Sequence, residues 1–262
     1  MTPLPDVTHR GAFLAAALGN TTAAATLVTG ETLGAVRRAP VDRLEDLSPV
    51  LARACPDCGG EAVPIAVVSV NPPVLERFQK LVHGMLLPTP HVAGLDFPIP
   101  LKTNVAAPER VGADRLLAAL AAWRCAGDAC IVVDCGTAIT VNSVRADGTF
   151  LGGAIFPGLA LMARALAQGT ALLPEFTVPE TAPKIGKNTT EAMAAGILHG
   201  VTGAVANLII VAGEVVGEDA RVFLTGGDAP RLAAFLPLDC REVHPDLVLE
   251  GMAIAFREWK QK

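Results

Sequence analysis

One short stretch constrains the fold of this chain more than any other. Residues 130–134 form an apolar run that ends in the carboxylate of Asp134, and Gly136-Thr137 follows directly. Such a run is typical of a strand buried in the centre of a sheet. The glycine lets a ligand approach the backbone, and the threonine hydroxyl and N–H can bind a phosphate oxygen. A buried strand with an ordinary turn fits the same residues, although burying Asp134 is costly unless it meets a cation or strong donors.

The same pattern occurs near the start of the chain. Residues 13–28 predict a strand, a turn at Gly19-Asn20-Thr21 and a second strand. In both places a helix and a further strand follow, so the order strand, turn, strand, helix, strand occurs twice. We therefore expect an α/β fold made of two duplicated halves with a cleft between them.

Turn residues and helical spacing predict the remaining elements. Asp147-Gly148 indicates a tight hairpin. Asn188 or Thr189, followed by Glu191, indicates a capping box at the start of a helix. The expected strands are residues 65–70, 138–144, 149–155 and 221–225. The expected helices are residues 74–86, 109–126, 158–168, 188–216 (with a break at Gly203) and 230–235, whereas residues 49–64 and 88–100 are expected to be loops.

The composition limits the partners and the compartment. With 51% hydrophobic and 18% charged residues, the chain can bury a substantial core. Its net charge of -5 argues against nucleic acid as a partner, because binding the phosphate backbone needs a basic face. Residues 1–11 do not resemble a secretory signal, and Asn207 and Glu214 interrupt the longest apolar stretch, residues 204–216. We expect a cytoplasmic protein that contacts no membrane.

Of the six cysteines, only Cys55 and Cys58 are spaced as a motif. A C-x-x-C pair resembles half of a zinc site or a redox pair, but structural zinc needs four ligands and no second pair has this spacing. Reduced thiols in a cytosolic loop are the favoured interpretation, with a metal site as the alternative.

Seven short motifs follow one another from about residue 13 to residue 256. They are Gly19-Asn20-Thr21; Gly112-Ala113-Asp114-Arg115; Asp134 to Thr140; Gly152-Gly153 through Pro157-Gly158, continued by Leu172-Leu173-Pro174; Ile185-Gly186-Lys187-Asn188-Thr189; Thr225-Gly226-Gly227; and His244-Pro245-Asp246-Leu247-Val248-Leu249-Glu250-Gly251. In this order the chain resembles the type III pantothenate kinases, members of the acetate and sugar kinase/Hsp70/actin superfamily. Each motif alone is weak, but seven in register are specific.

The resemblance implies a duplicated ribonuclease-H-like (actin-like ATPase) fold, with halves at residues 13–115 and 116–262. It implies an ATP-dependent kinase that phosphorylates pantothenate in the opening step of coenzyme A synthesis, and that works as a homodimer. The implied cofactors are ATP with Mg²⁺ and a monovalent cation, K⁺ or NH₄⁺.

The resemblance also implies roles for individual residues. Asp114 is the proton acceptor, and Asp134 is the ligand of the monovalent cation. The implied substrate contacts are Gly112, Ala113, Asp114, Arg115 and Thr189. The implied ATP contacts are Ala17, Leu18, Gly19, Asn20, Thr21, Thr22, Ala23, Ala24 and Thr137.

Elementary chemistry agrees with the first of these roles. A primary hydroxyl must lose its proton as it attacks the γ-phosphorus, and a carboxylate can accept it. The Arg115 guanidinium suits the pantothenate carboxylate, or holds Asp114 ionised. Two structural alternatives stay open: Asp114 and Arg115 as a solvated helix pair, and Thr189 as a plain helix cap.

Two positions depart from the family pattern. Ala17 stands where the first motif of the family begins with aspartate, a residue of the turn that holds phosphate and magnesium. Val105 or Asn104 stands where many members have a tyrosine in the substrate pocket. An active pantothenate kinase is the leading hypothesis, because Asp114, Arg115 and Asp134 are intact. The alternatives are a catalytically impaired nucleotide-binding homologue with a regulatory or accessory role, favoured by Ala17, and a kinase of another small molecule.

Overall fold

The computed structural model describes residues 11–55, 62–236 and 241–262. The chain divides into two compact units, and each unit draws on separate parts of the sequence. Unit 1 takes the described residues of Met1–Pro100 together with Gly112–Leu117 and Val248–Lys262; unit 2 takes those of Leu101–Val111 and Ala118–Leu247. The boundary expected after residue 115 falls inside helix α3 (Ala113–Ala126), whose first residues group with unit 1.

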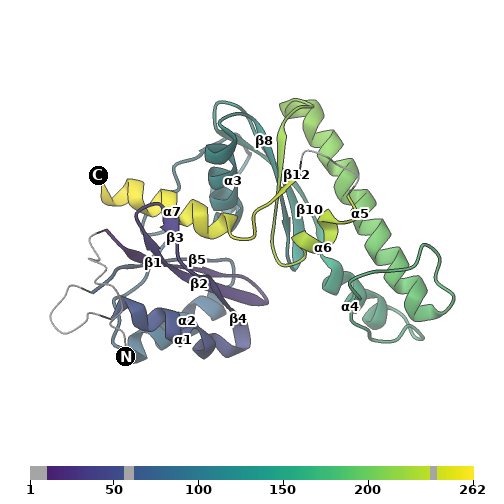
Figure 1. Ribbon diagram of the computed structural model, residues 1–262, viewed down its shortest axis with the longest axis horizontal. Coiled ribbons are helices and arrows are strands. Elements are labelled where there is room, and N and C mark those ends of the chain that lie inside the picture. The colour runs from purple at the N-terminus through teal and green to yellow at the C-terminus, as the bar shows by residue number, and fades with distance from the viewer. Residues whose placement is uncertain (1–10, 56–61, 237–240) are drawn as a thin grey trace, which may run out of the picture. The chain divides into compact units, whose positions relative to one another are not determined.

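Unit 1 is built on a sheet with helices on both faces (Figure 1). Its strands are β1 (Phe13–Leu18), β2 (Thr22–Thr29), β3 (Thr32–Leu33), β4 (Arg37–Pro40), β5 (Ile65–Ser69) and β6 (His91–Val92). Side chains alternate along β1, so Leu14, Ala16 and Leu18 face the core that holds α1 (Ser48–Leu51) and α2 (Pro72–Gly84). Phe13, on the opposite face, contacts α7 (Leu247–Lys260).

Aromatic rings hold α7 on this opposite face. The Phe256 ring lies 4.7 Å from the ring of Phe13 and 5.3 Å from that of Phe97, and the Trp259 ring stacks on Phe97 at 5.6 Å. At Gly251 the helix approaches the start of α3 so closely that a Cβ atom there would overlap the carbonyl oxygen of Leu117. In a chain with 4% aromatic residues, this cluster anchors the C-terminal helix to unit 1.

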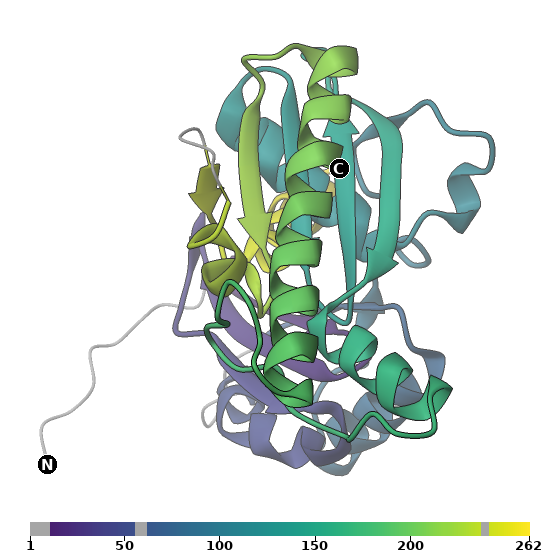
Figure 2. The same ribbon diagram turned by 90° about the vertical axis from the view of Figure 1, so that its right-hand side faces the viewer.

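Unit 2 is built on a second sheet, which α3 and α5 (Thr189–Val216) cover on opposite faces (Figure 1). Its strands are β7 (Lys102–Thr103), β8 (Cys130–Cys135), β9 (Ala138–Val144), β10 (Thr149–Pro157), β11 (Arg221–Thr225) and β12 (Arg241–Val243). Two shorter helices, α4 (Leu159–Gly169) and α6 (Ala229–Ala233), complete the unit. Figure 2 shows α5 lying along one face of the strands.

The two sheets share one topology, which confirms the predicted duplication. The strand order is β3-β2-β1-β5-β6 in unit 1 and β10-β9-β8-β11-β12 in unit 2. In unit 1, β1, β2 and β3 are antiparallel neighbours, and β1 pairs in parallel with β5, which pairs in parallel with β6. In unit 2, β8, β9 and β10 are antiparallel neighbours in the same way, and β8 pairs in parallel with β11, which pairs in parallel with β12. The two Gly-containing turns therefore occupy the same place, directly after the first strand of each sheet.

Most of the predicted elements are confirmed within a few residues. The hairpin forms at Asp147-Gly148, where Gly148 has φ +78°. The cap at Asn188 also forms: Asn188 Oδ1 accepts the N–H of Glu191 at 2.9 Å. Glu191 Oε2 accepts the N–H of Lys187 at 2.8 Å, one residue before the cap, rather than the N–H of Asn188 itself as in a capping box.

Several predictions are wrong in detail. α5 runs through Gly203 without a break, because its buried face packs along the whole sheet. Residues 48–54 are helical rather than looped, since Pro49 is tolerated in the first turn of α1. Strand β6 lies within the proline-rich stretch that was expected to be irregular. α3 begins at Ala113, after a separate 3₁₀ turn at Pro108–Arg110.

Two further features bear on the expected compartment and thiols. Among the described residues, α5 is the one helix long and apolar enough to cross a membrane by length and composition. However, ten of its residues are buried, and many of these belong to the core of unit 2. Cys55 is an exposed free thiol, and Cys58 lies outside the described residues.

Candidate functional site

The carboxyl end of β8 carries the turn for which the sequence predicts phosphate binding. Asp134 pairs with Thr140 of β9 and Thr225 of β11. The N–H of Gly136 closes the turn by donating to the carbonyl oxygen of Ala138 at 3.2 Å. Asp134 and Thr137 are half-buried. The turn therefore brings a carboxylate, a hydroxyl and backbone groups to one edge of the sheet.

Two other turns pack against this one, and both require glycine. A Cβ atom on Gly226, which has φ +89°, would overlap the Asp134 carboxylate and lie 2.6 Å from the carbonyl oxygen of Cys135. A Cβ atom on Gly158 would lie 2.8 Å from the carbonyl oxygen of Thr137, which accepts the Gly158 N–H at 3.0 Å. Three motifs far apart in the sequence thus meet around Asp134.

Asp228 is a second carboxylate beside this turn, and the motifs did not single it out, although it directly follows Gly226-Gly227. Its N–H donates to the carbonyl oxygen of Cys135 at 2.9 Å. Burial, followed by the charges of Asp134 and Asp228, raises the pKa of the Cys135 thiol. Burial also raises the pKa of Asp228, and the nearby guanidinium of Arg231 partly offsets this.

The carboxylates of Asp134 and Asp228 beside this turn suit a cation with oxygen ligands. In the described part of the chain, no three His, Cys, Asp or Glu side chains gather to form a metal cluster. A cation at this turn would therefore draw on one or two carboxylates together with backbone and phosphate oxygens, the oxygen-rich coordination that Mg²⁺ accepts. Gly227 is exposed and has open space around it, so a ligand can reach the backbone here.

The first turn of unit 1 has the same form but no carboxylate. The N–H of Gly19 donates to the carbonyl oxygen of Thr22 at 3.0 Å. Asn20, Thr21 and Thr22 are exposed, whereas Leu18 and Ala23 are buried and offer only backbone groups. Asn20 Oδ1 accepts a hydrogen bond at 3.3 Å from Asn71, whose own side chain caps α2. The turn therefore offers neutral hydroxyl, amide and N–H groups to an anion.

Ala17 lies at the end of β1, one residue before the buried Leu18. It pairs with Ala24 of β2 and Val68 of β5, and it is half-buried. Alternation places its side chain on the face of Phe13 and Ala15, away from the core that contains Leu18. The side chain at this position is therefore half-buried and is not part of the core that contains Leu18.

Asp114 is held at the first turn of α3 by its neighbours. Its Oδ1 accepts the N–H of Arg115 at 2.8 Å. A Cβ atom on Gly112 would lie 2.5 Å from the same oxygen, so the carboxylate occupies space that only glycine leaves free. Burial raises the pKa of Asp114, and the Arg115 N–H and charge act in the opposite direction. Burial lowers the pKa of Arg115. The glycine two residues before Asp114 thus leaves room for the carboxylate, which is a geometric reason for the Gly-x-Asp-Arg spacing.

Thr189 begins α5 and lines an apolar pocket of about 730 Å³ in unit 2. The pocket also contains Pro157, Leu173, Met162 and Met193. Pro157 and Leu173 belong to one motif and Thr189 to the next, so the fold brings these two motifs together as it does those around Asp134. Thr189 is exposed, and the helix cap is supplied by Asn188 instead.

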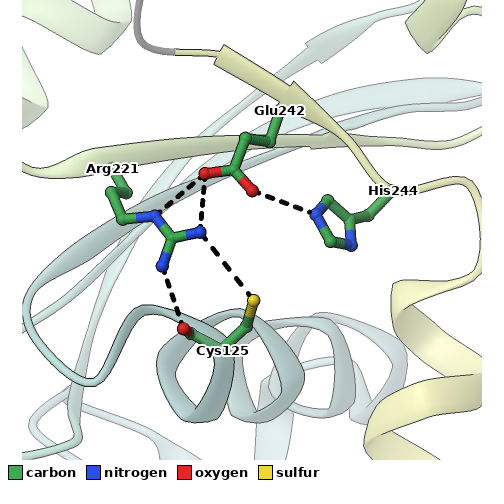
Figure 3. Close-up of polar contacts among 4 residues, drawn as sticks. All are labelled: Cys125, Arg221, Glu242 and His244. Carbon is green, nitrogen blue, oxygen red and sulfur yellow. Dashed lines mark hydrogen bonds and ion pairs between the residues drawn. The ribbon is translucent and has the colours of Figure 1, made fainter.

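His244, the first residue of the C-terminal motif, belongs to a polar network with Glu242, Arg221 and Cys125 (Figure 3). The Glu242 carboxylate accepts from Arg221 Nη2 at 2.6 Å and lies 3.3 Å from His244 Nε2. Arg221 Nη1 donates to the carbonyl oxygen of Cys125 at 2.9 Å. Arg221 therefore links β11 to the end of α3 and, through Glu242, to β12, and His244 contacts the same glutamate.

Duplicated half-folds with a glycine turn after each first strand define the actin-like class of ATPases and kinases. Solved structures with the same fold match most of the chain. One is a Campylobacter jejuni protein assigned to the Baf family of transcriptional activators, with a TM-score of 0.61 and 20% identity, covering 95% of this chain and 100% of that one. Another is the activator of 2-hydroxyisocaproyl-CoA dehydratase from Clostridium difficile with bound ADPNP, with a TM-score of 0.52 and 11% identity, covering 95% and 96%. At these identities the likeness shows the fold alone.

Sequence relatives define the family. The family model for type III pantothenate kinase matches residues 13–210. A type III pantothenate kinase from Dehalococcoides mccartyi (strain CBDB1) is 33% identical over 246 residues, covering 92% of this chain and 93% of the relative. One from Thermomicrobium roseum is 36% identical over 249 residues, covering 91% and 94%. The chain belongs to the type III pantothenate kinase family.

Gly112→Ala tests the geometric reason for the Gly-x-Asp-Arg spacing. The new methyl group would meet the end of the Asp114 side chain rather than backbone, so we expect the carboxylate to move and the fold to stay. If Asp114 acts in the reaction, turnover should fall by about tenfold or more, since misplacing a catalytic group is costly. The melting temperature should stay within about 2 °C of the parent's, a shift expected from less than 1 kcal/mol. A parent-like rate would show that the position of this carboxylate does not matter.

Proposed function

We propose that this chain transfers the γ-phosphate of ATP to the primary hydroxyl of pantothenate, in the opening step of coenzyme A synthesis, as a cytoplasmic enzyme. Family membership supports the reaction and its use of ATP with a divalent metal. The observation that carries the proposal for this chain is the Asp114 carboxylate, fixed at a helix start with a raised pKa.

Asp114 is proposed as the proton acceptor. A carboxylate whose pKa lies above the ordinary value holds a proton more readily, so it is a better base for the attacking hydroxyl. Oδ1 accepts the Arg115 N–H, which would orient the carboxylate towards the substrate hydroxyl. Arg115 would bind the pantothenate carboxylate, with Gly112, Ala113 and Thr189 as the other substrate contacts.

The two glycine turns are proposed to hold ATP. In unit 1, residues 17–24 would offer the N–H and hydroxyl groups of the Gly19-Asn20-Thr21 turn to phosphate oxygens. In unit 2, Thr137 would do the same, and Asp134 would bind a monovalent cation, K⁺ or NH₄⁺. When bound, magnesium would neutralise charge on the transferred phosphoryl oxygens.

A homodimer is proposed from the exposed face of α5. Ile210, Val211 and Val215 are 59%, 47% and 65% exposed on a helix whose other face is core. Exposed apolar residues grouped in this way mark an interaction surface. A second copy of the chain is the proposed partner, in keeping with the family resemblance.

The proposed reaction and base are tested together by coupled ADP release. With ATP, magnesium and potassium, the parent should release ADP only when pantothenate is present. Asp114→Asn should keep ATP binding and lower turnover by about 10²–10⁴, the usual contribution of a positioned base. The amide has the same shape and no basicity. Pantothenate-independent or absent ADP release by the parent would refute the reaction, whereas parent-like turnover of the variant would refute only the role of Asp114.

The pH dependence supplies the control for this variant. Because the pKa of Asp114 is raised, kcat/KM should fall on the acid side with a midpoint above 3.8, the ordinary value of the group. The folded state binds this proton more tightly than the unfolded state, so ionisation of Asp114 costs stability as pH rises through its folded pKa. Asp114→Asn should therefore not lower the melting temperature at neutral pH. A lower melting temperature would indicate a structural role.

Ala17→Asp tests whether the missing carboxylate limits the enzyme. The side chain would project from the end of β1 away from the core, so the melting temperature should change little. The magnesium concentration for half-maximal activity should fall, and turnover should rise by about tenfold, the scale of an outer metal contact. Unchanged magnesium dependence would show that Ala17 is not limiting. If parent and variant were both inactive with pantothenate, a non-catalytic nucleotide-binding role would be favoured.

The dimer is tested by sedimentation at micromolar concentration. The parent should sediment as a dimer, and Ile210→Lys should shift it towards the monomer, because the charge would be buried at the contact. Lys80→Ile, which removes an exposed charge in unit 1, is a control for a simple change of surface polarity. A monomeric parent would refute the dimer, and flotation with lipid vesicles would then favour a membrane as the partner of α5.

A further inference from the structure

Residues 170–188 connect α4 to α5 without helix or strand. They run past the N-terminal end of α5 (Figure 2) and contain Pro174, Pro179 and Pro183. We call this segment the strap. It ends at Asn188, which caps α5, and so leads directly into Thr189, the proposed substrate contact. Thr189 therefore lies at the junction of the strap and α5, next to the residues that the strap brings to the end of the helix.

The strap is anchored at its end by α5. The backbone at Gly186 packs so closely on α5 that a Cβ atom would lie 2.5 Å from Cα of Ala192. The N–H of Lys187 donates to Glu191 Oε2 at 2.8 Å, and His199 Nε2 lies 3.2 Å from the carbonyl oxygen of Pro183. These contacts fix the strap to the helix that it precedes, but not to the sheet.

A single arginine of α6 fixes the middle of the strap. Arg231 Nη2 donates to Glu180 Oε1 at 2.6 Å, and Nε donates to Oε2 at 3.2 Å, which is the two-pronged geometry that arginine forms with carboxylates. Nη1 also donates to the carbonyl oxygen of Val178 at 3.5 Å. Val178 is itself buried in the core of unit 2. The hydrogen bond from Arg231 lowers the pKa of Glu180, so the pair is ionised at neutral pH.

Arg231 also belongs to the turns around Asp134. It lies one turn after Asp228, with Nη1 3.7 Å from Asp228 Oδ1. The N–H of Asp228 donates to the carbonyl oxygen of Cys135. Arg231 therefore connects the strap to the edge of the sheet that carries Asp134 and Thr137.

Stability alone does not explain the pair. The Glu180 side chain is 79% exposed, and exposed ion pairs contribute little to the free energy of unfolding. Their geometry can still restrict where a segment lies, and Arg231 is only 17% exposed.

We propose that Arg231 and Glu180 are positioning residues, which hold the strap so that Thr189 is placed for pantothenate relative to the Thr137 turn. This inference rests on the proposed function of Thr189 and Thr137. Neither residue of the pair needs to touch substrate. Losing the pair should loosen the strap and weaken pantothenate binding, while the chemical step and the ATP turn remain intact.

Steady-state kinetics of Glu180→Gln and Arg231→Gln, singly and together, test this. Each variant should raise KM for pantothenate by about two- to fivefold, the effect of a well-oriented exposed pair, with kcat and KM for ATP close to the parent values. The double variant should be no worse than Arg231→Gln alone, because each single variant already breaks the pair, and Arg231→Gln also loses the contacts with the Val178 carbonyl oxygen and Asp228. Glu175→Gln is the matched control, since Glu175 is an exposed glutamate of the same strap, and it should leave KM unchanged.

Two further measurements distinguish the possible failures. In about 0.5 M tetramethylammonium chloride, which screens exposed pairs, the KM values of parent and Glu180→Gln should converge. Hydrogen exchange at residues 181–187 should be faster in Glu180→Gln than in the parent or Glu175→Gln. Additive effects, or a lower melting temperature with unchanged KM, would overturn the proposal. If the parent did not phosphorylate pantothenate, the proposed function would fail. Hydrogen exchange that is the same in Glu180→Gln and the parent would separately show that the pair does not hold the strap.

Discussion

Close approach of backbone to backbone at the carboxyl end of the unit 2 sheet is the constraint on which the candidate site depends. The turns after β8, β10 and β11 meet there, and Gly158 and Gly226 have no room for a Cβ atom. Such contacts fix relative position better than side-chain packing does, because peptide groups have few soft torsions. The benefit is a rigid edge at which Asp134, Thr137 and Asp228 are placed by main-chain hydrogen bonds.

Asp114 shows a different way to place a reactive group. Its carboxylate is held by one N–H and by the absence of a side chain at Gly112. Burial disfavours its charged form, so the folded state carries an ionised group that would be more stable in water. A purely structural residue gains nothing from that arrangement, whereas a base gains proton affinity. The cost to stability is therefore an argument for function at this position.

The sequence was sufficient to predict the duplicated fold and the two glycine turns, because both depend on local signals. Apolar runs, Gly148 and the Asn188 cap each specify a conformation through neighbouring residues. The short strands β3, β4 and β12 and the helix α7 escaped prediction, since their place is set by contacts distant in sequence, such as Phe256 on Phe13. The same reason explains why Asp228, Glu180 and Arg231 were not singled out: their partners lie dozens of residues away or belong to the backbone of another strand.

The two turns differ in charge, and this difference bears on the absent carboxylate at Ala17. The unit 1 turn offers only neutral groups, while two carboxylates lie near Cys135 in unit 2. Neutral N–H and hydroxyl groups can bind phosphate without any metal, so an alanine at position 17 leaves the neutral donor groups of this turn in place. Magnesium keeps several waters and needs few carboxylates, so it does not demand one from every turn. Alanine is also the dominant residue of β1 and β2, which pair side by side in the sheet and place Ala17 opposite Ala24. The alanine at position 17 is therefore consistent with the alanine-rich pairing of these strands, and a carboxylate there would project away from the core that contains Leu18.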